Sequence, residues 1–121
     1  MSDIAGYYRI HRIRTVDSSL ISLPRGLRDD ALVGITANGR FEATTGCNDI
    51  TGRVRAEGET IRFSGVSATR RLCIGDAGSF EFLLLVALDH STIVEMDGDE
   101  LRFYDVNDDP VMVLRRTIVV R

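Results

Sequence analysis

The sequence predicts a mostly β (α+β) fold: an antiparallel curved sheet or half-barrel of about 7–8 strands, with one buried helix near residues 79–90. Two observations predict it. Apolar and polar residues alternate with a period of two along most of the chain, which is typical of strands with one face in water. This alternation gives way once, to an apolar run that follows a glycine-bearing loop at residues 75–78. The length of 121 residues predicts one domain over residues 1–121.

The first strand is expected over residues 7–14. The phase of its apolar residues slips between Ile10 and Ile13, which predicts a β-bulge. Residues 15–31 are expected to form a loop, because they contain proline and glycine, and a strand is expected to follow near residues 32–37.

Three strands of a meander come next, at residues 40–47, 50–57 and 60–64. In the first of them Cys47 shares the apolar face with Phe41, so we expect its sulfur to point into the core. Turns are expected at three glycine-bearing sites: Asn38-Gly39, Glu57-Gly58-Glu59 and Ser64-Gly65.

The expected helix over residues 79–90 contains good helix formers and is apolar on nearly every side, which predicts a helix buried against a concave sheet with apolar surface left to cover. Ser79 is its expected N-cap. Two hairpins follow, with turns at residues 97–99 and 107–110. The β-prone residues 117–120 are expected either to extend the last strand or to pair with a second chain in a homodimer.

The charges are unevenly placed. All fifteen basic residues are arginines dispersed along the chain, and the net charge is −3, so nucleic-acid binding is not expected. Residues 1–28 nevertheless carry a charge of +3 and residues 89–110 a charge of −7. No apolar run is long enough for a transmembrane segment. The first residues lack an export signal, which predicts a cytoplasmic location, or a periplasmic or envelope location if a leader was removed.

The four classical chemistry-bearing residues, Cys47, Cys73, His11 and His90, do not form a recognisable catalytic or metal motif. No two of them lie within ten positions of each other, whereas zinc ligands come in close pairs. The sequence therefore predicts no catalytic residue, no metal and no cofactor. For the cysteines, a disulfide would close a loop of about 26 residues, worth roughly 3 kcal/mol. In a reducing compartment we expect free thiols packed close together instead.

Several stretches, in the right order over most of the chain, carry a resemblance to a known family. Gly46-Cys47-Asn48, continued by Ile50, Gly52 and Val54, resembles the G-C-N-x-aromatic-x-G-x-aromatic signature of META domains, the HslJ-like family. Thr69-Arg70-Arg71-Leu72-Cys73 resembles that family's T-R-M-A-C. Gly6-Tyr7-Tyr8-Arg9-Ile10 resembles the family's opening G-x-W-x-L. The chain departs from the pattern at four positions, where tryptophan, two aromatic residues and methionine are replaced by Tyr8, Ile50, Val54 and Arg71.

The resemblance implies a compact β fold with one helix across it and no established catalytic residues. It also implies a link to stress or the envelope, because family members are often lipoproteins or periplasmic proteins. The fold is similar to that of secretion pilotins, which hold a lipid tail in an apolar cleft. We interpret the six motif residues as structural, with Asn48 in left-handed geometry at a corner; they are Gly46, Cys47, Asn48, Gly52, Thr69 and Cys73.

The sequence favours a non-enzymatic binding or interaction module. An apolar groove beside the helix, or an edge strand, would receive an unknown protein partner, a peptide or a lipid-like ligand. The alternative is a small-molecule enzyme that uses charged residues at the mouth of the barrel. The residues considered for the groove or the mouth are Arg70, Arg71, Glu81, Phe82 and His90.

Overall fold

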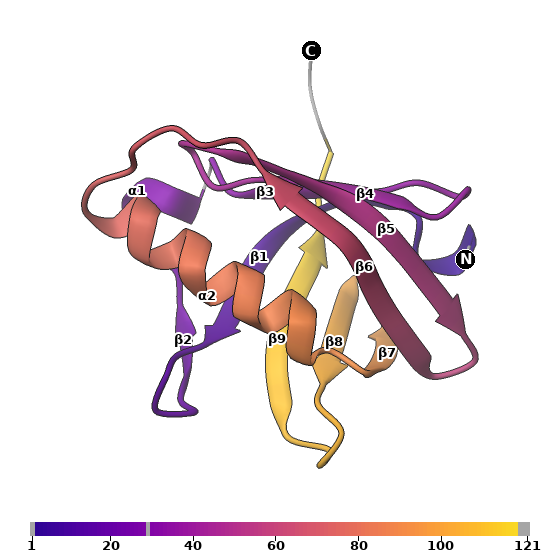
Figure 1. Cartoon of the computed structure of the whole chain (residues 1–121). Helices are drawn as coiled ribbons and strands as arrows, with labels where there is room; N and C mark the ends of the chain where they lie inside the picture. Colours follow the sequence, from indigo (N-terminus) through magenta and orange to yellow (C-terminus); the bar gives the residue numbers. More distant parts are fainter. Residues whose placement is uncertain (1, 29, 119–121) are drawn as a thin grey trace.

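The computed structural model describes residues 2–28 and 30–118. They form one antiparallel sheet of nine strands and a long helix (Figure 1). The strands in chain order are β1 (Gly6–Arg14), β2 (Leu20–Ser22), β3 (Leu32–Ile35), β4 (Arg40–Thr44), β5 (Asp49–Glu57), β6 (Thr60–Ala68), β7 (Ile93–Asp97), β8 (Glu100–Tyr104) and β9 (Pro110–Arg116). The helices are the 3-10 turn η1 (Ser2–Ile4), the short α1 (Arg25–Arg28) and the long α2 (Asp76–His90).

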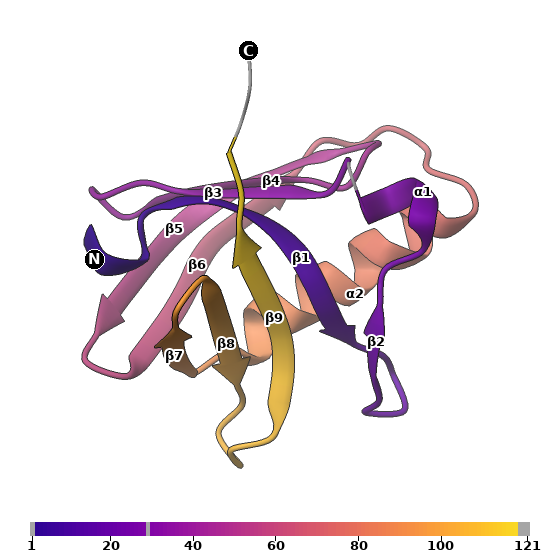
Figure 2. The same ribbon diagram turned by 180° about the vertical axis from the view of Figure 1, so that it is seen from behind.

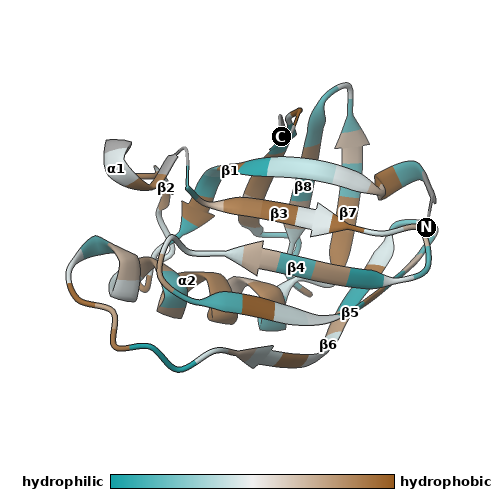
Figure 3. Ribbon diagram, turned by 90° about the horizontal axis from the view of Figure 1, so that it is seen from above, coloured by the Kyte–Doolittle hydropathy of each residue, from teal (hydrophilic) through white to brown (hydrophobic). Residues whose placement is uncertain are grey.

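The sheet curls until its hydrogen bonding returns to β1. The strand order is β2-β1-β3-β4-β5-β6-β7-β8-β9, and β1 pairs with β9 as well as with β3 (Figure 2). The strand pairing around the ring is shortest between β6 and β7, where the register contains one pair, Thr60 opposite Ile93. The helix α2 packs against β1, β6 and β9, beneath the layer that contains β4 and β5 (Figure 3).

One face of α2 fills the inside of this ring. Its buried residues are Phe80, Leu84, Ala87 and Leu88, whose i, i+4, i+7, i+8 spacing places them on one side of a helix. An aromatic cluster of Phe41, Phe63 and Phe103 packs within the same core. The largest fully buried apolar side chains elsewhere in that core are Tyr8, Ile13, Ile50, Leu101, Met112 and Leu114.

The predicted fold class is confirmed, and so is the bulge in β1, where the register against β9 shifts between Ile10 and Arg12. Two local predictions are wrong. The expected loop at residues 15–31 contains β2 and α1, because β1 extends beyond β3 and offers its free edge to a short strand. The expected turn at Ser64-Gly65 is instead a bulge inside β6, where residues 65–66 lie opposite Gly52 alone.

The helix begins three residues earlier than predicted. It starts at Asp76, and Gly75 occupies the N-cap position without a side-chain cap, so Ser79 lies within the first turns. No helix among the described residues is long and apolar enough to cross a membrane.

Candidate binding groove

The GCN motif forms a corner held together by Asn48. This side chain is buried, and its Oδ1 accepts hydrogen bonds from the Arg71 backbone N–H at 2.8 Å and from Thr69 Oγ1 at 3.0 Å. Its Nδ2 donates to the Arg71 carbonyl at 3.1 Å and to Cys73 Sγ at 3.2 Å. Asn48 therefore joins the end of β4 to the loop that leads into α2.

Two expectations for this corner are wrong. Cys47 is half-buried rather than in the core, and its sulfur forms a disulfide with Cys73, so neither side chain is a free thiol. The reason is positional: Cys47 follows the end of β4, where the alternation of faces no longer applies. Asn48 does not adopt a positive φ. The residue of this corner that has the left-handed conformation is Gly46, at φ +86°.

Gly52 allows Phe41 and the backbone of Ser64 to pack closely against β5. A Cβ there would come within 2.6 Å of Phe41 Cε1 and 3.0 Å of the Ser64 carbonyl oxygen. Any side chain would therefore force the Phe41 ring or the neighbouring backbone to shift.

The helix α2 is apolar on two faces, and only one of them is enclosed by the sheet. Phe82 and Val86 lie one turn apart on the outer face, and Phe82 is 57% exposed. Two hairpin tips rise beside this face, and each carries an exposed valine, Val16 between β1 and β2 and Val106 between β8 and β9. Both tips lie on the same side of the molecule (Figures 1 and 2).

The space between these elements is a hollow of about 940 Å³. Its lining contains the four exposed apolar side chains together with His90 and Asp105. A second hollow, of about 670 Å³, shares Val16 and Phe82 with the first and continues to Cys73, before the start of α2. We call the two together the outer groove. It follows the whole outer face of α2, a length of roughly 22 Å for fifteen residues.

Single exposed apolar side chains are normal on protein surfaces, but several that converge on one hollow indicate a contact surface. The outer groove brings Val16, Phe82, Val86 and Val106 together from three separate elements.

The floor of the groove contains an ion pair. Arg14 Nη1 donates to Asp105 Oδ2 at 2.8 Å, and the two side chains are only 14% and 13% exposed. The hydrogen bond from Arg14, followed by the backbone N–H groups of Asp109 and Asn107, holds the pKa of Asp105 below its ordinary value. The carboxylate thus fixes the β8–β9 tip against β1.

This pKa shift predicts a pH dependence of stability. A carboxylate with a depressed folded-state pKa stabilises the fold above its unfolded-state pKa of about 3.9, and the contribution is lost as the pH falls through the folded-state value. We therefore expect Asp105→Asn to lower the free energy of unfolding at neutral pH and to flatten its fall below about pH 4. Urea titrations at several pH values test this, with the exposed Glu59→Gln as control. An unchanged acid slope would contradict it.

A model of the META domain family matches residues 4–118. The chain belongs to the META domain family. Solved structures with the same fold include an NMR structure of a protein from Burkholderia xenovorans, 19% identical, with a TM-score of 0.72 over 95% of this chain and 83% of that one. Another is the crystal structure of a DUF4847 family protein from Bacteroides vulgatus, 12% identical, with a TM-score of 0.67 over 98% of this chain and 99% of that one. A comparison with curated proteins finds no match.

The META motif residues come together in space. Thr69 and Cys73 both contact Asn48, and Cys73 is bonded to Cys47. Arg71, where the family has methionine, offers its backbone to Asn48 and exposes its side chain, so the substitution leaves the core untouched.

Of the residues predicted for a groove or mouth in this META domain, Phe82 and His90 line the outer groove. Arg70 and Arg71 are exposed in the loop before α2 and do not line it. Glu81 is half-buried, and its Oε1 accepts no hydrogen bond from the described residues. The prediction missed Val16, Val86 and Val106; the signal was a valine in each of two turn sequences, TVDSS and DVNDDP.

Among the described residues of the META domain, no three histidine, cysteine, aspartate or glutamate side chains lie close enough together to hold a metal ion.

Proposed function

We propose that this META domain is a non-enzymatic binding module and that the outer groove receives an apolar segment of a partner protein. The observation that carries the proposal is the convergence of Val16, Phe82, Val86 and Val106 on one continuous hollow beside α2. A groove of roughly 22 Å accommodates about six or seven extended residues. Burying exposed apolar side chains of this kind stabilises a complex by about 25 cal/mol per Å² before the costs of association.

The enzyme alternative has less support. Its residues were Arg70, Arg71, Glu81 and His90, and within the described part of the chain no hydrogen bond or ion pair joins their side chains. His90 instead lies 3.4 Å from a guanidinium nitrogen of Arg14. A general acid or base needs a partner that orients it toward a substrate, and this arrangement offers none.

The disulfide bears on location. A Cys47–Cys73 bond persists in oxidising compartments and is rare in the cytosol. We therefore favour the periplasm or the envelope over the cytoplasm, in line with the stress- or envelope-related role that the family resemblance implies.

The groove can be tested with Nile red, a neutral apolar dye that brightens when it leaves water. We expect the wild-type chain to enhance its fluorescence and the double variant Phe82→Ser, Val86→Ser to lose most of that enhancement, because both side chains line the groove. Met96→Ser removes an exposed apolar side chain from β7, away from the groove lining, and is expected to behave as wild type.

Equal dye binding by all three chains would contradict the proposal. Native mass spectrometry of the protein purified from cells distinguishes a lipid from a protein segment as the occupant of the groove. A lipid that co-purifies with the protein would identify the lipid as the occupant.

A further inference from the structure

The outer groove is acidic at its rim. Three carboxylates line it, Asp105 and Asp109 in the β8–β9 turn and Asp89 at the end of α2. Asp108 and Asp17 are sequence neighbours of lining residues in the two hairpin turns. Among the described residues, the basic side chains in its lining are Arg14, which is already paired with Asp105, and His90. The last turn of α2 also lies here, and the negative end of a helix dipole favours cations. An anionic lipid headgroup is therefore disfavoured, and an occupant with positive charge is favoured.

The segment that follows β9 has the complementary character. Residues 117–121 read Thr-Ile-Val-Val-Arg, three β-branched apolar residues followed by an arginine. Of these, Ile118 is 84% exposed. The apolar residues match the exposed apolar side chains that line the groove, and the arginine matches its acidic rim.

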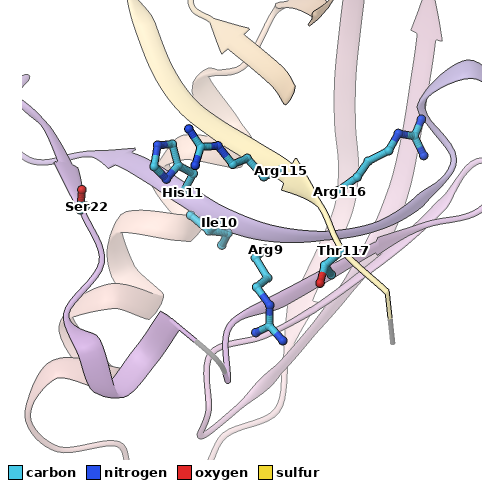
Figure 4. A pocket seen from close by; sticks show the side chains of 7 residues that line it. All are labelled: Arg9, Ile10, His11, Ser22, Arg115, Arg116 and Thr117. Carbon is cyan, nitrogen blue, oxygen red and sulfur yellow. The ribbon is translucent and has the colours of Figure 1, made fainter. Parts of the chain in front are cut away.

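The segment also leaves the molecule through a basic surface. Thr117 lines a hollow of about 480 Å³ together with Arg9, His11, Arg115 and Arg116, and no acidic side chain of the described residues lines it (Figure 4). Part of this charge is balanced, because Arg115 Nε donates to Glu100 Oε2 at 2.8 Å. The Arg116 side chain points away from Arg9 and His11 and donates to two backbone carbonyls near the N-terminus.

The base of the segment is fixed, and it lies far from its own groove. The Thr117 backbone N–H donates to the Tyr7 carbonyl at 2.9 Å, which holds the chain on β1 up to this residue. In both ribbon views the C-terminal end of β9 lies at the end of the molecule opposite the two hairpin tips (Figures 1 and 2).

We propose that residues 118–121 of a second copy of the chain dock in the outer groove, while Thr117 stays on β1 of its own copy, so that copies associate head to tail. The proposal rests on the function proposed above for the groove. Four extended residues span about 13 Å, within the roughly 22 Å length of α2. The basic surface around Thr117 then approaches the acidic hairpin tips of the next copy. Such a contact between two different surfaces forms a closed ring or an open chain.

Sedimentation velocity over a wide concentration series tests the proposal. We expect the full chain to associate at high concentration and two variants to stay monomeric there: a deletion of residues 117–121, and Phe82→Ser with Val86→Ser. A mixture of the two variants is expected to associate one to one, because the first retains a groove and the second retains a segment. Asp89→Asn with Asp109→Asn should weaken association by about tenfold, and added salt should weaken it further.

Three outcomes would overturn the proposal: a full chain that stays monomeric at every concentration, a deletion that leaves association unchanged, or a mixture that does not associate. Nile red separates this failure from failure of the groove itself. If the full chain is monomeric but binds the dye, and the Phe82→Ser, Val86→Ser variant does not, the groove is a binding site and its occupant is a different protein. If dye binding does not depend on Phe82 and Val86, both the binding function of the groove and the head-to-tail association are overturned.

Discussion

Replacing Cys47 and Cys73 with serine is expected to lower the free energy of unfolding by about 3 kcal/mol and the Tm by roughly 10–15 °C. The disulfide closes a loop of 26 residues, which restricts the unfolded chain. Serine keeps a small polar atom at both sites, so Asn48 Nδ2 still has an acceptor at position 73. The variant therefore removes the cross-link and little else.

Urea unfolding with and without dithiothreitol measures this effect and contains its own control. The reductant should destabilise the wild-type chain as much as the double substitution does, and it should leave the double variant unchanged. The m-value should rise when the bond is absent, because the unfolded chain then exposes more surface. A wild-type chain that is indifferent to reductant, with two alkylatable thiols, would refute the disulfide and the oxidising location inferred from it.

The alternating pattern was sufficient to predict the sheet. Ile50 and Val54, which replace aromatic residues of the family pattern, are buried as the period of two requires. Tyr8, in place of tryptophan, is fully buried, and its hydroxyl donates to the Ile4 carbonyl at 2.6 Å. Such positions are predictable because their neighbours in sequence determine their face.

The groove was only partly predictable, because a helix that is apolar on two faces has two structural explanations. Full enclosure and a second, open contact face give the same sequence pattern around Phe82 and Val86. The distinction depends on the distant hairpin tips that carry Val16 and Val106, which tertiary structure alone brings to the helix. The Cys47–Cys73 bond was missed for a related reason, since residues 48–72 separate its two ends.

The second large effect is expected at Asn48. Replacing it with alanine should lower the free energy of unfolding by about 3 kcal/mol, because the buried Asn48 amide makes four hydrogen bonds, and its loss leaves the Arg71 N–H and carbonyl without their partner at a partly buried corner. Asn48→Asp should also destabilise, since a carboxylate keeps the acceptor but faces the Arg71 carbonyl with no donor. The exposed Asn107→Ala is the matched control and should stay within about 0.5 kcal/mol of wild type.

Combining Asn48→Ala with the two serine substitutions tests whether the corner is one cooperative unit. The amide and the disulfide hold the same loop, residues 69–73, against the same turn after β4. Once either restraint is gone the loop can detach, so removing the other should cost less than it does in the wild-type chain. We expect the triple variant to lose less stability than the sum of the two effects, measured by urea unfolding. Strict additivity would mean that the two restraints act independently and that the family motif is two separate structural devices.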